Sequence, residues 1–174
     1  MWWSRIVAIV VAAGLLAACG FQPLYGGGKR GPAAAELASI RIEPIADRSG
    51  QMLRNHLLDR LNPYGAPARP AYILRVAMTD SQSGIAVRRS EFPTRTTLRV
   101  AASYTLSRAD TGAAVFSAES AIEGGYNILD SEFATLAAEQ NVRERVIREV
   151  AFDMEARLAA FFRLQEQPAA QRAP

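Results

Sequence analysis

The residue types that enzymes most often use for catalysis are scarce in this sequence. Its 174 residues include one cysteine, Cys19, and one histidine, His56, so an internal disulfide is excluded and a histidine-based zinc site or catalytic triad is not expected. Glu119 and Glu123 share one face of a predicted strand, but about 13 Å of strand separates them, too far for paired catalytic carboxylates. The sequence also lacks nucleophile-elbow, phosphate-loop and dinucleotide-binding motifs. We therefore expect a binding protein rather than an enzyme, without a cofactor or a metal.

Arginine is the residue type with the clearest chemical use here. All of the 20 basic residues except Lys29 are arginine, and the planar guanidinium group can bind phosphate or carboxylate through two hydrogen bonds at once. Residues 69–108 carry a net charge of +5, whereas residues 109–174 carry a net charge of −5. The whole chain, at +3, is too weakly basic for an obligate nucleic-acid-binding protein. A basic central segment followed by an acidic C-terminal segment is therefore its main electrostatic feature.

Four arginines of the basic segment gather near one predicted hairpin tip. The strand predicted over 92–106 places its odd-numbered residues on one face, which sets Arg95 and Arg99 on the same side. Arg88 and Arg89 lie in the turn before that strand. Position alone leaves two interpretations open, an anion-binding site and a solvated basic loop.

The first 19 residues predict export followed by lipid attachment. Arg5 precedes an uncharged, mostly apolar run over 6–18, which as a helix would cover about 20 Å, short of the ~30 Å hydrocarbon core of a bilayer. Residues 1–18 are therefore expected to be a cleaved signal peptide. Residues 16–19, Leu-Ala-Ala-Cys, resemble the bacterial lipobox, which implies acylation of Cys19 and an anchor of several acyl chains. The alternative is an ordinary signal peptide followed by an unmodified cysteine.

Composition and periodicity predict one folded domain between flexible ends. Glycines and a proline in 26–35 indicate a tether, and the polar, alanine-rich C-terminus indicates a frayed tail. We expect an acylated N-terminus and flexible tether over 19–36, a single domain over 37–164 and a disordered tail over 165–174. Strands are predicted over 37–45, 71–80, 92–106 and 113–126, and helices over 49–61 and 131–164, with Ser49 and Ser131 as their N-caps.

The resulting order β-α-β-β-β-α predicts an α+β fold of two layers. Three consecutive strands joined by short connections imply an antiparallel meander, so the four-stranded sheet should be mainly antiparallel. Both helices carry an apolar stripe and should pack on one face of this sheet. The even-numbered residues of 92–106 are largely apolar and the odd-numbered ones are polar and partly basic. The other face of the sheet should therefore stay polar.

Two short motifs carry a resemblance to a known family. Residues 19–26 read Cys-Gly-Phe-Gln-Pro-Leu-Tyr-Gly, and residues 125–127 read Gly-Tyr-Asn just before the acidic start of the last predicted helix. Together with the element order, they resemble the LptE family of lipopolysaccharide-assembly lipoproteins, in particular its alphaproteobacterial branch. The resemblance covers essentially the whole mature chain. Gly20, where aspartate would favour the inner membrane by the enterobacterial sorting pattern, agrees with an outer-membrane location.

The resemblance implies a function without catalysis. The domain would plug the lumen of an LptD-type outer-membrane β-barrel as its 1:1 partner, help that barrel to assemble, and bind lipopolysaccharide during its insertion into the outer leaflet. One alternative is a periplasmic lipoprotein subunit of an ABC lipid-transport or secretion system. Another is a lipid-anchored hydrolase, which the lack of a nucleophile–base pair disfavours. The candidate contacts for lipopolysaccharide phosphates are Arg88, Arg89, Arg95 and Arg99.

Overall fold

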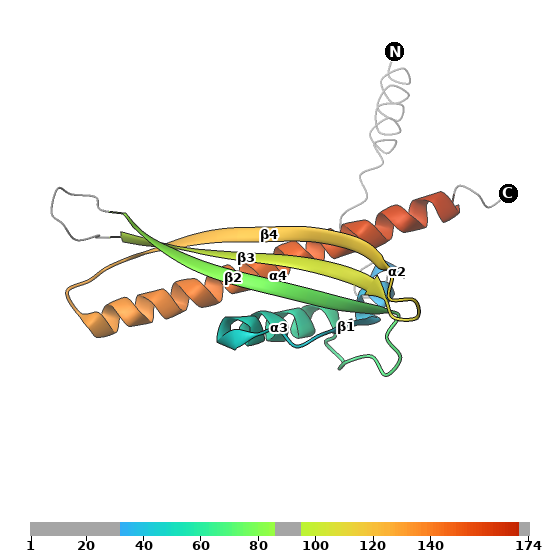
Figure 1. Cartoon of the computed structure of the whole chain (residues 1–174), viewed down its shortest axis with the longest axis horizontal. Helices are drawn as coiled ribbons and strands as arrows, with labels where there is room; N and C mark the ends of the chain where they lie inside the picture. Colours follow the sequence, from blue (N-terminus) through green and yellow to red (C-terminus); the bar gives the residue numbers. More distant parts are fainter. Residues whose placement is uncertain (1–31, 86–94, 171–174) are drawn as a thin grey trace, which may run out of the picture. The chain divides into compact units, whose positions relative to one another are not determined.

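The computed structural model describes residues 32–85 and 95–170. Within these residues, four strands form one sheet in the order β1-β2-β3-β4, and helices lie along one face of it (Figure 1). The two-layer α+β prediction is therefore confirmed. The elements are α2 (Pro32–Ala38), β1 (Ile40–Ile42), α3 (Asp47–Leu61), β2 (Tyr72–Ile85), β3 (Arg95–Arg108), β4 (Ala114–Asn127) and α4 (Glu132–Ala170).

The sheet is mainly antiparallel, as predicted. The short strand β1 pairs parallel to β2, with Ile40 opposite Tyr72, whereas β2–β3 and β3–β4 pair antiparallel along almost their full lengths. A register irregularity between Leu106 and Ser107 marks a bulge at the β3–β4 hairpin end. The three long strands therefore extend far beyond β1 and form a ribbon at the other end of the sheet (Figure 1).

Alternation along β3 divides the sheet into two faces. The even-numbered residues from Thr96 to Leu106 are buried, while the odd-numbered ones are exposed or half-buried. The buried face meets the apolar stripe of α4, and α3 packs beside it through a second stripe. The core side chains that are almost fully buried include Leu98, Val100, Leu106, Leu53, Leu57, Ile147, Val150, Met154, Leu158 and Phe162.

Local structure at the N-terminal end of the domain differs from the prediction. Residues Pro32–Ala38, which fall largely in the predicted tether, form α2, and the first strand begins at Ile40 rather than at residue 37. Proline suits the first position of a helix, and alanine has the highest helix propensity. Ala33 and Leu37 also pack against the core, so burial fixes a helix that composition alone suggested would be flexible.

One of the two predicted helix caps is wrong and the other is confirmed. Helix α3 begins two residues before Ser49, with Ala46 at the N-cap and no side-chain hydrogen bond there. Asp47 has a φ of 65°, and a Cβ on Gly50 would lie 2.7 Å from Ile45 Cγ2, so close packing sets this helix start. At the start of α4, by contrast, the Ala134 amide donates to Ser131 Oγ at 3.4 Å.

Two elements run further than expected. Strand β2 continues through Ser81 and Ser83 to Ile85, because β3 offers each of these residues a ladder partner as far as Arg95. Helix α4 continues to Ala170, into the segment 165–174 that was expected to be frayed. Among the residues described, no helix is both long enough and apolar enough to cross a membrane.

Candidate functional site on the outer face of the sheet

The sheet face that turns away from the helices, here called the outer face, is built mostly from small residues, among which serine and threonine are the commonest. The inner face carries the core, so the outer face has to be compatible with water. Its charged residues stand out because serine, threonine and alanine surround them. Its small residues include Ala77, Thr79, Ser81, Ser83, Thr97, Ala101, Ser103, Thr105, Ser117 and Ala121.

Arg99 on this face forms an ion pair with the neighbouring strand. The register places it opposite Glu123, and Arg99 Nη1 donates to Glu123 Oε1 at 2.8 Å. Both side chains are 53% exposed, so the pair contributes at most about 1 kcal/mol to stability. The charge of Arg99 is nevertheless balanced within the sheet.

Arg95, by contrast, has no ion-pair partner among residues 32–85 and 95–170. It is exposed at the start of β3, opposite Asn127. Its guanidinium group lies across Gly125, where an added Cβ would come within 2.9 Å of Arg95 Nη2. An exposed guanidinium whose charge is not balanced nearby is suited to bind a phosphate or carboxylate from another molecule.

The residue before Gly125 serves the opposite face. A Cβ on Gly124 would lie 2.6 Å from Val146 Cγ2 and 2.8 Å from Val142 Cγ1, so the absence of a side chain lets α4 approach β4 closely. The two adjacent glycines therefore have different structural roles. The first allows helix packing on the inner face, and the second leaves space for Arg95 on the outer face.

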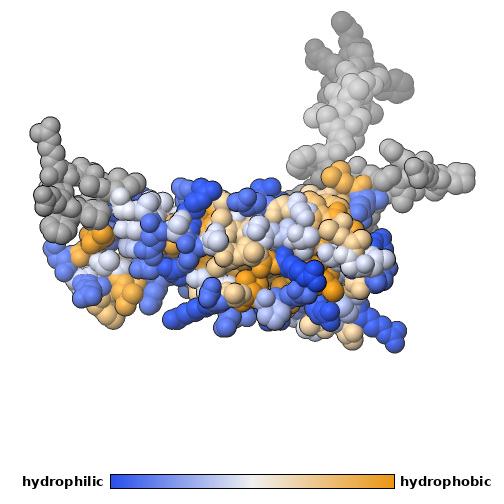
Figure 2. All heavy atoms as spheres, in the orientation of Figure 1, coloured by the Kyte–Doolittle hydropathy of each residue, from blue (hydrophilic) through white to orange (hydrophobic). Residues whose placement is uncertain are grey.

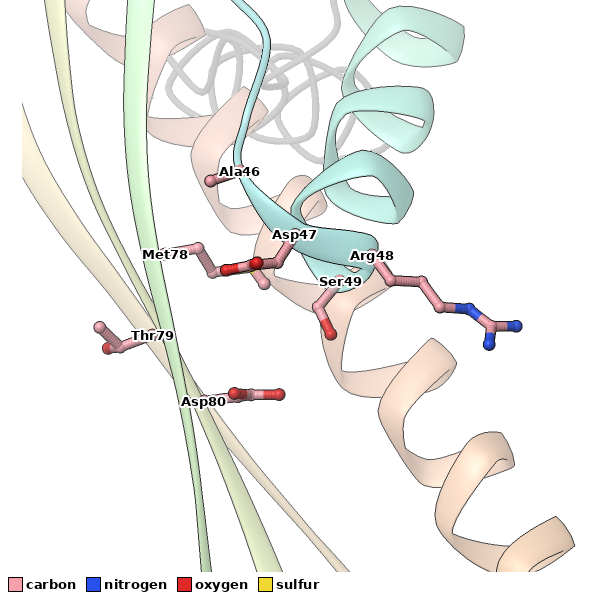
Figure 3. A pocket seen from close by; sticks show the side chains of 7 residues that line it. All are labelled: Ala46, Asp47, Arg48, Ser49, Met78, Thr79 and Asp80. Atoms are coloured by element: carbon pink, nitrogen blue, oxygen red, sulfur yellow. The ribbon is translucent and has the colours of Figure 1, made fainter.

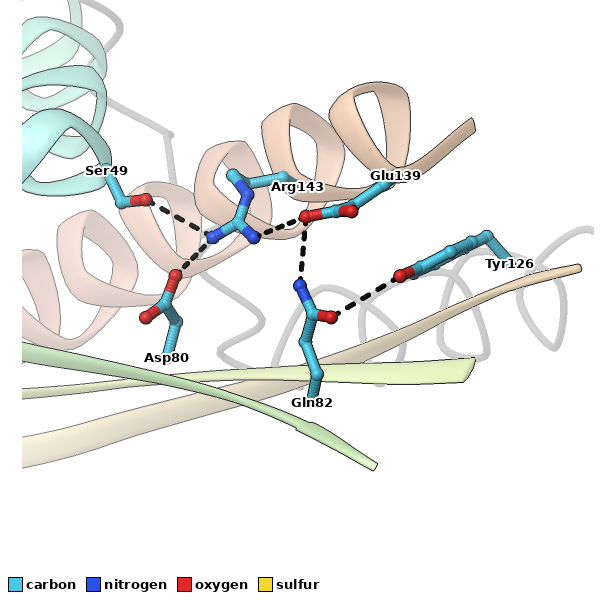
Figure 4. Close-up of polar contacts among 6 residues, drawn as sticks. All are labelled: Ser49, Asp80, Gln82, Tyr126, Glu139 and Arg143. Atoms are coloured by element: carbon cyan, nitrogen blue, oxygen red, sulfur yellow. Dashed lines mark hydrogen bonds and ion pairs between the residues drawn. The ribbon is translucent and has the colours of Figure 1, made fainter. Parts of the chain in front are cut away.

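A polar network connects helices α3 and α4 to strand β2 (Figure 4). Arg143 on α4 is its centre: it forms an ion pair with Asp80 on β2, donates to Glu139 Oε1 at 2.8 Å and contacts Ser49 Oγ at 3.4 Å. Gln82 Nε2 donates to the same carboxylate oxygen at 2.9 Å. The network therefore joins α3, β2 and α4 beyond the apolar core.

Hydrogen bonding in the network shifts the pKa values of Glu139 and Arg143. The Arg143 hydrogen bond, reinforced by Gln82, lowers the pKa of Glu139 despite some desolvation. The same bond raises the pKa of Arg143. Both groups therefore stay charged at neutral pH, and the network acts as a structural tie rather than as an acid–base pair.

A pocket of about 390 Å³ lies beside this network, between the start of α3 and β2 (Figure 3). Asp47, Ser49 and Asp80 are among its lining residues, and Met78 is its one large apolar side chain. Ligand pockets are lined mainly by apolar and aromatic groups, and Asp80 already binds Arg143. In the described part of the chain, no three acidic, histidine or cysteine side chains are placed to hold a metal ion. The pocket therefore does not resemble a cofactor site.

The structure places only part of the predicted site. Arg95 and Arg99 lie on the exposed outer face, as the strand pattern predicted. Cys19, Arg88 and Arg89 fall outside the described residues, so their predicted roles stay predictions.

Sequence reasoning missed the glycine pair and the Arg143 network. The signal for the network was present, because Asp80 is a charged residue in the inward phase of a strand. Arg143 and Glu139 are likewise spaced four residues apart on one helix face.

Comparisons with known proteins agree with this architecture. The sequence model of one family, LptE: Lipopolysaccharide-assembly, matches residues 37–158. A comparison with curated proteins gives no match. A putative lipoprotein from Caulobacter crescentus CB15 has a similar crystal structure, with a TM-score of 0.62 and 26% sequence identity over 83% of this chain and 99% of that chain.

Two more distant structures share the fold alone. A minor lipoprotein from Acinetobacter baumannii has 16% identity and a TM-score of 0.57, over 70% of this chain and 90% of that chain. The rare lipoprotein B from Shewanella oneidensis has 12% identity and a TM-score of 0.55, over 74% of this chain and 98% of that chain. Because the family match spans well over half of the sequence, this chain belongs to the LptE family of lipopolysaccharide-assembly proteins.

Proposed function

We propose that this protein is an outer-membrane lipoprotein that partners an LptD-type β-barrel and binds lipopolysaccharide during its insertion into the outer leaflet, without catalysing a reaction. The observation that carries the proposal is the family match over residues 37–158. The predicted lipobox at Cys19 supplies the membrane anchor, since several acyl chains bind a bilayer far more stably than one.

The outer face is compatible with a position inside a barrel lumen. Barrel interiors are polar, and a plug must present a polar surface to them. Serine, threonine and alanine occupy many positions of the outer face, and its Arg99–Glu123 pair is balanced in charge. Such a surface can form hydrogen bonds with a polar wall, and Arg95 and Glu119, which have no ion-pair partner among the described residues, would need partners from that wall or from a ligand.

Arg95 is the candidate contact for lipopolysaccharide that the structure supports best. Its guanidinium group is exposed and has no carboxylate partner among the described residues. Arg88 and Arg89 precede it in the sequence and complete the basic group. Arginine–phosphate pairs of this kind would compete with the cations that bridge phosphates between lipopolysaccharide molecules. Arg99 is a weaker candidate, because a phosphate would first have to displace Glu123.

Purification of the full-length chain from native membranes tests the barrel partnership. We expect acylated protein in the outer membrane and a stable 1:1 complex with one large β-barrel. The matched control is Cys19→Ser, which should abolish acylation and membrane retention. Co-purification with an inner-membrane transporter instead would contradict the proposal and favour a subunit of an ABC lipid-transport system. Turnover of ester or glycan substrates by the purified chain would favour a hydrolase.

A further inference from the structure

Strand β4 forms one edge of the sheet, and no described residue pairs with its free side. In an antiparallel strand, about half of the backbone amides and carbonyls point to each side, so a strand of 14 residues leaves a long row of unpaired groups. Long edges are usually protected by proline, lysine, a bulge or inward-pointing charge. Strand β4 contains neither proline nor lysine, and its bulge lies at the hairpin end only.

Three inner-face residues next to this edge are apolar and incompletely covered, whereas Ser120 and Tyr126 at other inward positions of β4 are buried. Phe116, Ala118 and Ile122 are half-buried, whereas Leu98 and Val100 at inward positions of the neighbouring β3 are fully buried. Over the face of the molecule that Figure 2 shows, apolar residues reach the surface between hydrophilic ones. A further strand beside β4 would bury the remaining apolar surface and pair the free backbone groups.

The opposite edge of the sheet differs at its far end. Beyond its contact with β1, β2 also has a free side, with the half-buried Val76 and Met78 and then Asp80 and Gln82 at its inward positions. Asp80 and Gln82 are held by α4, through Arg143 and Glu139 respectively. Inward-pointing polar groups oppose strand addition. The apolar edge along β4 is therefore the one suited to accept a strand.

The outer face of β4 carries two glutamates. Glu119 and Glu123 lie four ladder positions apart; Glu123 is paired with Arg99, and Glu119 has no ion-pair partner among the described residues. A second copy of β4 pairing antiparallel would place glutamate opposite glutamate in the registers centred on Glu119, Ala121 or Glu123, which is unfavourable. A strand with basic residues at these positions would instead be favoured by the same charges.

We infer that the free edge of β4 binds an extended strand of another protein, in which apolar residues alternate with basic ones. Its apolar residues pack beside Phe116 and Ile122, and its basic residues face Glu119 on the outer face. The backbone hydrogen bonds supply affinity, and the alternating side chains supply specificity. This inference goes beyond the proposed function and does not depend on which protein supplies the strand.

Amide hydrogen exchange of the full mature chain in detergent tests the inference, with a short peptide that alternates valine and arginine as the probe. At a peptide concentration of about ten times Kd, alternate amides between Phe116 and Tyr126 should exchange about tenfold more slowly. The amides of β2 beyond Asp80 should not change. Protection of these β4 amides in the free chain, or no change on adding peptide, would overturn the inference.

Two N-methylated versions of the peptide test whether the backbone pairs. Methyl groups on one alternate set of amides should abolish binding, while methyl groups on the other set should be tolerated, since an added strand uses one edge only. Equal binding by both versions would overturn strand addition. Glu119→Lys should weaken binding about fivefold, whereas Glu149→Lys on the exposed side of α4 should leave it unchanged. Concentration-dependent protection of β4 without peptide would show that a second copy is the occupant, and would overturn the assignment.

Discussion

The inner and outer faces of the sheet differ in the substitutions that they tolerate. On the inner face, Gly124 is required because α4 lies against it, with Val146 Cγ2 2.6 Å from any added Cβ. On the outer face, its neighbour Gly125 meets only the flexible end of Arg95. The inner face determines stability, and the outer face is free to be selected for binding. Substitutions on the two faces should therefore affect different measurements.

The largest difference should come from truncating adjacent residues of β3. Leu98→Ala leaves a cavity in the fully buried core and should lower the free energy of unfolding by about 2–5 kcal/mol. Thr97→Ala on the outer face should change it by less than about 0.5 kcal/mol. Urea unfolding of both variants measures the difference. Similar losses for the two would show that the outer face also carries the fold.

The glycine pair allows a sharper comparison of the two faces. Gly124→Ala forces the new methyl group against Val142 and Val146 and should cost about 1–3 kcal/mol of stability. Gly125→Ala displaces only the guanidinium group of Arg95, so its cost should stay below about 1 kcal/mol. Thermal unfolding ranks the two variants, and the reverse order would contradict the assigned packing.

A buried hydroxyl on the inner face offers the next test. Tyr104 is 2% exposed, and its hydroxyl has no hydrogen-bond partner among the described residues. Tyr104→Phe keeps the ring beside Phe116 and should be neutral or stabilising by up to about 1 kcal/mol. A loss of stability of more than about 1 kcal/mol would indicate that the hydroxyl has a hydrogen-bond partner.

The same residue predicts an alkaline effect. Burial raises the pKa of Tyr104 from 10.0 to about 12, so between these values the unfolded chain loses its proton and the folded chain keeps it. Stability should therefore fall as the pH rises from 10 to 12. Tyr104→Phe should remove this part of the decline in urea midpoints measured across that range. An unchanged decline would contradict the role of burial.

The smallest effect is expected in the Arg143 network. The pKa of Glu139 is lowered in the folded chain, so its stabilisation is present above the usual value of 4.5 and is lost as the pH falls through the lowered one. Glu139→Gln should cost less than about 1 kcal/mol at pH 7 and should reduce the loss of stability in acid. Urea unfolding midpoints at neutral and acidic pH measure the cost of the substitution and the loss of stability in acid. A steeper acid decline in the variant would contradict the assignment.

Periodicity was sufficient to predict the layers, the antiparallel meander of the three long strands and the polar outer face, because alternation in β3 and the stripe in α4 repeat over many residues. It was not sufficient for the ends of elements. The extension of β2 to Ile85 depends on ladder partners in β3, and α2 depends on burial of Leu37. The start of α3 depends on the contact between Gly50 and Ile45. Contacts between distant segments fix all three, and a local pattern does not encode them.

The candidate site was predictable only in part for the same reason. The strand phase placed Arg95 and Arg99 on the outer face, but it could not show that Glu123 pairs with Arg99 while Arg95 has no ion-pair partner among the described residues. That distinction depends on the register between β3 and β4. The charge asymmetry of the sequence therefore located the basic segment, and the structure shows which of the two described arginines near the predicted hairpin tip forms an ion pair.

Lipopolysaccharide binding by two charge-matched variants tests the central claim most directly. One variant combines Arg88→Ala, Arg89→Ala and Arg95→Ala, and the other removes the same charge from exposed arginines elsewhere through Arg41→Ala, Arg69→Ala and Arg108→Ala. The account predicts that the first binds lipopolysaccharide more weakly, most clearly at low salt, with unfolding unchanged, and that the second binds as the unsubstituted chain does. Equal binding by both variants at low and high salt would contradict it.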